Sequence, residues 1–217
     1  MARALSPEAE ALAATDPAIA ALVERFGTRS IAERMRGGSH FSDLARIIVG
    51  QQVSTAAAAT VWGRICDAFG GEAPAAEDVI GADEVLRGCG LSGRKASYVV
   101  GIGETIVAGE LEPEALTEAS DDEVIGQLTA LRGLGRWSAE MFLMFNLGRP
   151  DVFSGGDLGL RRGIQVALEM EEPPGPDESV AIAERWRPHR TLACIYLWEA
   201  ARVGLPGDPE RERPPSN

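Results

Sequence analysis

Lysine and cysteine are scarce in this 217-residue chain, and each scarcity excludes a class of chemistry. Lys95 is its one lysine, so a reaction through a lysine Schiff base has a single side-chain candidate. The three cysteines, Cys66, Cys89 and Cys194, form no CxxC pair and are too few for a four-cysteine cluster. We therefore expect neither a zinc site nor an iron–sulfur cluster.

Long apolar runs are also missing. No stretch approaches the roughly 18 apolar residues that a membrane span needs. The N-terminal residues lack the basic start and apolar stretch of a secretory signal. We expect a cytoplasmic protein with no membrane partner.

Positive charge is in deficit. The chain has 33 acidic and 21 basic residues, which gives a net charge of −12. Such a balance opposes bulk attraction to DNA or to anionic membranes, because like charges repel over the whole surface. Any contact with nucleic acid must therefore be local.

The hydrophobic pattern favours helices nearly throughout. Alanine, leucine, glutamate and arginine dominate, and runs of β-branched residues with a period of two are missing. We predict an all-α fold with two helical lobes and a cleft between them. The expected helices are Asp16–Phe26, Phe41–Val49, Thr55–Phe69, Ala82–Arg87, Arg94–Ala108, Asp121–Ala130, Trp137–Asn146, Leu158–Met170, Glu178–Arg185 and Arg190–Val203. The expected division is into N-terminal helices that pack with the C-terminal lobe (1–39), a helical lobe (40–149), the C-terminal lobe (150–204) and a disordered tail (205–217).

One segment, LTALRGLGRWSAEMFLMF, places two glycines between two amphipathic helices. Gly133 and Gly135 allow a tight turn, so this segment predicts a helix-hairpin-helix inside the 40–149 lobe. The turn would leave backbone N–H groups pointing outward, where they suit a phosphate oxygen. Alternatively, the glycines only join two packed helices.

A second segment, SGGDLGLRRG, places Asp157 directly before a predicted helix. Its carboxylate could simply cap the N–H groups of Gly159 or Leu160. A carboxylate beside two glycines can also be approached closely by a substrate and can face positive charge that develops on a sugar carbon. The local pattern leaves both interpretations open.

The two segments together resemble the helix-hairpin-helix DNA glycosylases that carry a glycine/proline-rich loop and an aspartate. The closest similarity is to their alkylated-base branch, the bacterial 3-methyladenine DNA glycosylase II group. IIVGQQVS (47–54), GLSGRKASY (90–98) and RWRPHRTLACIYLW (185–198) fit that branch as well. The similarity spans 41–203 and implies a helical version without the N-terminal β lobe of well-known members.

The resemblance implies a monofunctional hydrolase that excises alkylated bases, of the 3-methyladenine and 7-methylguanine type, in base excision repair. Its partner would be double-stranded DNA with a damaged base, bound by a monomer. Asp157 matches the catalytic aspartate, and Gln52 stands where the family inserts a wedge side chain into the DNA. The expected base pocket is Trp137, Trp198, Tyr196, Phe145 and Met141. The expected DNA-binding residues are Gln51, Gln52, Ser54, Arg132, Gly133, Gly135, Arg136, Trp137 and Ser138.

No cofactor is expected to be required, although backbone carbonyls of Thr129, Leu131 and Leu134 match those that hold a structural Na⁺ or K⁺ in this family. Trp137 falls where bifunctional relatives carry a nucleophilic lysine, which implies a monofunctional enzyme. Two alternatives stay open. One is a non-catalytic helix-hairpin-helix protein that only binds DNA; the other is a bifunctional glycosylase with lyase activity through Lys95.

Overall fold

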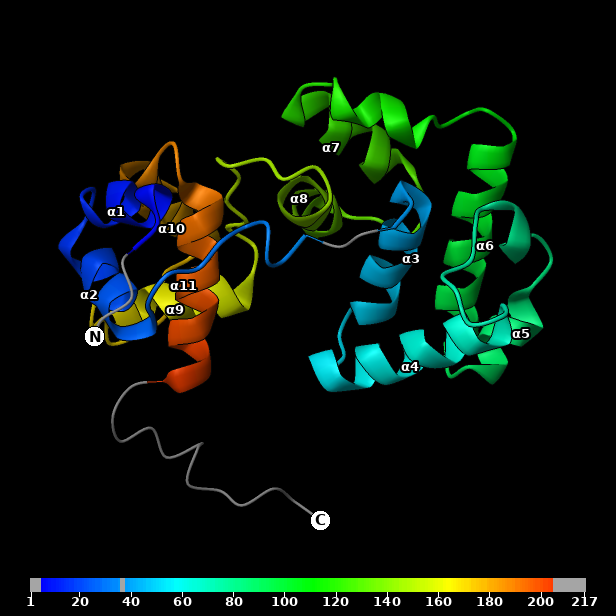
Figure 1. The fold of residues 1–217 in the computed structure, drawn as a ribbon, viewed down its shortest axis with the longest axis horizontal. Coiled ribbons are helices and arrows are strands. Elements are labelled where there is room, and N and C mark those ends of the chain that lie inside the picture. Colours follow the sequence, from blue (N-terminus) through cyan, green and yellow to red (C-terminus); the bar gives the residue numbers. More distant parts are fainter. Residues whose placement is uncertain (1–4, 36–37, 205–217) are drawn as a thin grey trace, which may run out of the picture. The chain divides into compact units, whose positions relative to one another are not determined.

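The computed structural model describes residues 5–35 and 38–204. Over these residues the chain is helical and contains no β-strand, which confirms the all-α prediction (Figure 1). The α-helices are α1 (Pro7–Ala13), α2 (Pro17–Phe26), α3 (His40–Gly50), α4 (Thr55–Ala68), α5 (Asp83–Gly88), α6 (Gly93–Val107), α7 (Asp121–Ala130), α8 (Arg136–Phe145), α9 (Leu158–Ala167), α10 (Pro176–Ala183) and α11 (Arg190–Val203). Short 3₁₀ helices cover Glu77–Val79, Pro113–Thr117 and Glu184–Trp186.

Most helix starts follow from side-chain caps that the sequence carries. Ser54 and Ser92 accept hydrogen bonds from backbone N–H groups in the first turns of α4 and α6. At α7, Ser120 and Glu123 form a reciprocal capping box. Helix α1 was not predicted, although Ser6 as N-cap and Pro7 at the first position mark its start.

One compact unit combines the two ends of the chain, residues 1–34 and 149–217. Its described part contains α1, α2, α9, α10 and α11, with α9 and α2 packed against α11. Fully buried Leu12, Ile19, Ile164, Trp186 and Ile195 belong to its core. The disorder predicted for 205–217 concerns residues outside the described ranges.

The other compact unit is residues 35–148. Helix α3 contacts α4, α6 and α8, and α7 packs against α8. Its core includes the fully buried Leu44, Ile48, Leu86, Leu128 and Phe142. The two units divide the chain at 34/35 and 148/149, whereas the sequence-based division is at 39/40 and 149/150.

Two further observations concern the described ranges. No helix there is both long enough and apolar enough to cross a membrane. The same residues include no group of three or more His, Cys, Asp or Glu side chains placed to hold a metal ion. Cys89 and Cys194 are buried, Cys66 is half-buried, and all three are free thiols.

Candidate active site and DNA-binding hairpin

The turn between α7 and α8 has the geometry of a helix-hairpin-helix. Gly133 has a φ of +97°, and a Cβ there would lie 2.3 Å from Cδ2 of Tyr98, so only glycine fits. Gly135 is different, because its φ is −103° and no heavy atom would lie within 4 Å of its Cβ. The packing of the unit requires Gly133, whereas it leaves open space at Gly135.

This open space lies at the start of α8, where Gly135 is the N-cap and no side chain caps the helix. The first N–H groups of a helix have no intrahelical acceptor and form the positive end of the helix dipole. The exposed Arg132 stacks over the ring of Tyr98 at 5.6 Å. Arg136 donates from Nε to the buried Glu140 at 2.9 Å. The start of α8 thus combines uncapped N–H groups with the exposed Arg132, a combination that suits an anion.

Two of the expected DNA-binding side chains instead support this hairpin from inside. The side-chain amide of Gln51 donates to the carbonyl of Gly133 at 2.9 Å and to Oγ of Ser138 at 3.2 Å. Ser138 is only 2% exposed. Both side chains therefore already make hydrogen bonds within the unit, and DNA binding by Gln51 and Ser138 stays a prediction.

Gln52 and Ser54 are exposed in the turn between α3 and α4. Gln52 has a φ of +56°, in the left-handed region that residues other than glycine rarely adopt. Ser54 caps α4 by accepting from the N–H of Ala57 at 3.2 Å. Gln52 thus differs from Ser54 in that its side chain is exposed and does not cap α4.

The backbone carbonyls of Thr129, Leu131 and Leu134, which are expected to hold a cation, differ in how far their hydrogen-bonding capacity is already used. Within the described chain, no main-chain N–H outside the helices donates to the carbonyls of Thr129 and Leu134. The carbonyl of Leu131 accepts from the N–H of Leu134 at 3.2 Å, which leaves its second lone pair. Carbonyl oxygens are ligands that hard monovalent and divalent cations accept, so the donor set suits such an ion.

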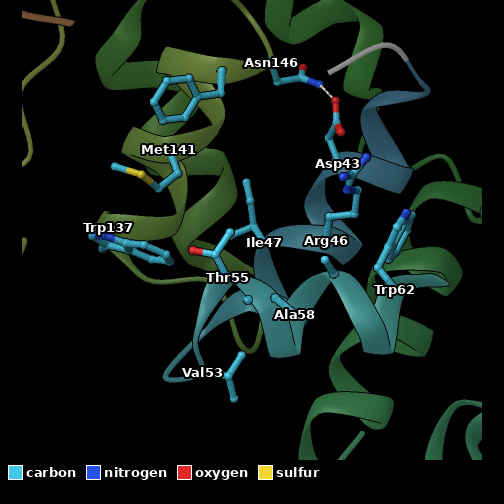
Figure 2. Close-up of a pocket in the computed structure, with 13 residues that line it drawn as sticks. Asp43, Arg46, Ile47, Val53, Thr55, Ala58, Trp62, Trp137, Met141 and Asn146 are labelled. Carbon is cyan, nitrogen blue, oxygen red and sulfur yellow. Dashed lines mark hydrogen bonds between the residues drawn. The ribbon is translucent and has the colours of Figure 1, made fainter. Parts of the chain in front are cut away.

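A pocket of about 350 Å³ lies within the 35–148 unit (Figure 2). Trp137, Met141 and Phe145 project into it from α8, at the i, i+4 spacing that puts side chains on one helix face. The opposite walls come from α3, α4 and the turn between them. These residues are Asp43, Arg46, Ile47, Gly50, Val53, Thr55, Ala58, Ala59 and Trp62, and the lining also includes Asn146, the C-cap of α8.

The far end of the pocket is polar and was not predicted. Asn146 donates its side-chain amide to the buried carboxylate of Asp43 (Figure 2). The guanidinium of Arg46 lies 5.3 Å from the ring centroid of Trp62. These four residues come from α3, from α4 and from the C-cap of α8, and no local pattern in the sequence signals that they meet.

Asp157 is the N-cap of α9, in the other unit. Its Oδ1 accepts from the N–H of Leu160 at 2.8 Å and from the indole Nε1 of Trp198 at 3.1 Å. A Cβ on Gly159 would lie 3.0 Å both from Oδ1 of Asp157 and from Cδ1 of Trp198, so this glycine permits the close approach. The hydrogen bond from Leu160 caps α9, and the hydrogen bond from Trp198 holds the same carboxylate oxygen. One arrangement therefore both caps the helix and fixes the position of the carboxylate.

Tyr196 does not fit its expected place in the base pocket. It is 0% exposed, its hydroxyl donates to the carbonyl of Gly27 at 3.0 Å, and it accepts from the N–H of Arg29 at 3.1 Å. Burial raises the pKa of this hydroxyl above its ordinary value. A ring enclosed in this way cannot stack on a base, so we withdraw Tyr196 from the pocket; the helical spacing did not reveal which face of α11 is covered.

Lys95, the one candidate for lyase chemistry, is also engaged. Its ammonium donates to the carbonyls of Val49 at 2.9 Å and Gln51 at 2.7 Å. Burial lowers the pKa of this ammonium. Two hydrogen bonds to carbonyls keep the nitrogen at the end of α3, and this arrangement gives no support to Lys95 as a nucleophile.

The chain therefore combines a glycine hairpin of the helix-hairpin-helix type with a helix-capping aspartate beside an indole. Comparison with known protein families agrees with the helix-hairpin-helix assignment. Residues 45–188 match the HhH-GPD superfamily base excision DNA repair protein family, and the chain belongs to that family.

Individual relatives cover most of this chain. A 3-methyladenine DNA glycosylase of Schizosaccharomyces pombe, solved in complex with abasic DNA, is 29% identical with a TM-score of 0.84, covering 91% of this chain and 97% of its own. A DNA-3-methyladenine glycosidase structure from Bacillus halodurans is 36% identical with a TM-score of 0.76, covering 95% and 92%. A Bacillus subtilis relative is 30% identical over 169 residues, which are 75% of this chain, and the match spans 59% of that relative.

Proposed function

We propose that the protein is a monofunctional DNA glycosylase that hydrolyses the N-glycosidic bond of alkylated bases, of the 3-methyladenine and 7-methylguanine type, in double-stranded DNA. The observation that carries the proposal is the carboxylate of Asp157, held at the start of α9 by Leu160 and Trp198. The relatives from S. pombe and B. halodurans bear 3-methyladenine glycosylase names and support this choice. The proposal includes the cytoplasmic location and monomeric state expected from the sequence.

The chemistry follows from the charge of the substrate. A purine alkylated at N3 or N7 is cationic and already a good leaving group, so little acid catalysis is needed. The sugar develops positive charge as the bond breaks, and an ionised carboxylate stabilises that charge or orients the attacking water. Asp157 performs this task in the proposal.

Selection of the base relies on the aromatic side chains. A damaged base must leave the DNA stack at a cost of a few kcal/mol before it can react. Stacking on an indole favours a cationic base over a neutral one by about 0.5–2 kcal/mol. Trp137, which lines the pocket in the 35–148 unit, is the indole that we assign to this step.

DNA is gripped locally in this proposal. The N–H groups at the start of α8 bind a backbone phosphate, and the space beside Gly135 lets the phosphate approach. Such a grip needs no basic surface, which agrees with the net charge of −12. A Na⁺ or K⁺ held by the carbonyls of Thr129, Leu131 and Leu134 would add positive charge beside the same phosphate.

The monofunctional assignment rests on two side chains. Trp137 stands where bifunctional relatives have lysine, and Lys95 is hydrogen-bonded to the end of α3. In the non-catalytic alternative the carboxylate of Asp157 would only cap α9 through Leu160. The second hydrogen bond, from the indole of Trp198, is not needed for capping and favours the catalytic role.

The decisive test is release of methylated bases by Asp157→Asn. The asparagine carbonyl can still accept from Leu160 and Trp198, so thermal stability should stay near that of the wild type. The rate should fall by roughly 100-fold or more, the scale for removing one group that stabilises transition-state charge. Trp198→Phe, which removes the indole N–H and leaves a smaller aromatic ring, should lower the rate less, by roughly tenfold.

Asp177→Asn is the matched control, because Asp177 also lies in the first turn of a helix in the same unit and is exposed. It should release bases at the wild-type rate. A near wild-type rate for Asp157→Asn would contradict the proposed mechanism. Tight binding to abasic DNA without any base release by the wild type would favour the non-catalytic alternative.

A further inference from the structure

The turn between α3 and α4 carries an unusual backbone conformation. Gln52, at its tip, has a φ of +56° and is exposed, and the next residue, Val53, is 47% exposed. A left-handed conformation at a residue other than glycine persists only when its surroundings hold it.

Lys95 provides the contact on one side. It lies in the first turn of α6, and its ammonium donates to the carbonyls of Val49 and Gln51, at 2.9 Å and 2.7 Å. The last carbonyls of a helix have no intrahelical donor, and a cation there also meets the negative end of the helix dipole. The second of these bonds restrains the peptide group that joins Gln51 to Gln52.

Gln51 continues the connection on the other side. Its side chain donates to Gly133 and Ser138, so the same turn is tied to the hairpin between α7 and α8. Lys95, the turn and the hairpin thus form one series of hydrogen bonds across three parts of the 35–148 unit. None of these four hydrogen bonds is local in sequence.

We propose that Lys95 is a positioning residue that holds the turn 51–54 in the conformation that presents Gln52 to DNA. This inference rests on the proposed function, since it assumes that Gln52 acts on the DNA at a damaged site. Lys95 itself touches neither the DNA nor the reacting bond. It acts by fixing the carbonyl of Gln51, and through it the backbone of Gln52.

The simpler role, a cap that only stabilises α3, makes a different prediction. A cap affects the fold whether or not residue 52 has a side chain to present. A positioning residue loses its effect on DNA once the side chain that it positions is gone. A double-mutant cycle between Lys95 and Gln52 separates the two, because residues that act through each other are non-additive.

The experiment uses the full chain and a duplex with a stable abasic-site analogue, at one fixed salt concentration. Affinity is measured for the wild type, Lys95→Met, Gln52→Ala and the double variant, with thermal unfolding as the check on folding. Lys95→Met should weaken binding by roughly tenfold in the wild-type background, within the range of coupled neighbours. In the Gln52→Ala background the same change should weaken binding by less than about twofold.

Arg94→Met is the matched control, since it removes one positive charge from the adjacent, exposed position of the same helix. It should leave affinity near the wild-type value in both backgrounds. If Lys95→Met does not fold, Lys95→Arg takes its place in the same cycle, with the same criterion of non-additivity.

An equal loss of affinity in both backgrounds would overturn the proposal, because Lys95 would then be a structural cap. No loss in either background would also overturn it. The readout is binding, so it remains valid if the wild type releases no base. In that event the proposed function fails while the coupling of Lys95 to Gln52 is still measured.

Discussion

The hairpin geometry predicts a large loss of stability for Gly133→Ala. The added methyl carbon would lie 2.3 Å from Cδ2, 2.4 Å from Cγ and 2.8 Å from Cβ of Tyr98, all far below normal contact. Overpacking of this kind costs about 1–3 kcal/mol. The φ of +97° adds about 1–2 kcal/mol for a residue with a Cβ. We therefore expect the free energy of unfolding of the 35–148 unit to fall by about 2–5 kcal/mol.

Gly135→Ala, two residues away, is the internal control for this prediction. A methyl group there meets no atom within 4 Å, and φ is negative, so the free energy of unfolding should fall by at most about 1 kcal/mol, the usual N-cap preference. Its effect should instead be on DNA, because the methyl group occupies the space where we place a phosphate.

Urea unfolding followed by circular dichroism measures the stability of both variants, and binding to an abasic duplex measures the second effect. Gly135→Ala should weaken binding by roughly tenfold, which is 1.4 kcal/mol. Equal stability losses for the two alanines would refute the packing argument. Unchanged affinity for Gly135→Ala would refute the assignment of the phosphate.

Two further predictions concern the cation and Tyr196. If a monovalent cation supports the hairpin, replacing K⁺ by tetramethylammonium at constant ionic strength should weaken DNA binding by up to about tenfold, and equal affinity in both salts would count against the ion. The raised pKa of Tyr196 means that the folded state holds its proton more tightly than the unfolded state, so this stabilisation is complete below pH about 10 and is lost as pH rises through the folded-state pKa. Tyr196→Phe should cost about 1–2 kcal/mol at pH 7, because Gly27 and Arg29 lose a partner, and should flatten the alkaline loss of stability seen in urea titrations. An unchanged alkaline slope would show that another group causes it.

The helices were largely predictable because their signals are local. The ten expected helices correspond to α2 through α11, with ends displaced by a few residues. Ser120 with Glu123, or Ser54 before Thr55, acts over three or four positions, and such bonds are visible in one stretch of sequence. Helix α1 was missed because its seven residues are too few for a clear periodicity.

The side chains of the site were harder to place. Trp137, Met141 and Phe145 share a face because they are four residues apart on one helix, and they do line one pocket. Tyr196 is on a helix with apolar residues on several sides, so its burial depended on the packing of α2 against α11. The contact of Asp43 with Asn146 spans 103 residues, and no pattern in either helix indicates it.

The amino-acid sequence alone determined the helical class, the glycine hairpin, the placement of Asp157 before a helix and the lack of a lysine at position 137. Each of these depends on residue identity or on spacing within one or two turns. Only the tertiary structure decided that Trp198 holds the Asp157 carboxylate, that Gln51 supports the hairpin and that Lys95 restrains the turn at Gln52. The physical reason is that these hydrogen bonds join residues 41 to 82 positions apart, and such pairs meet only once the helices have packed.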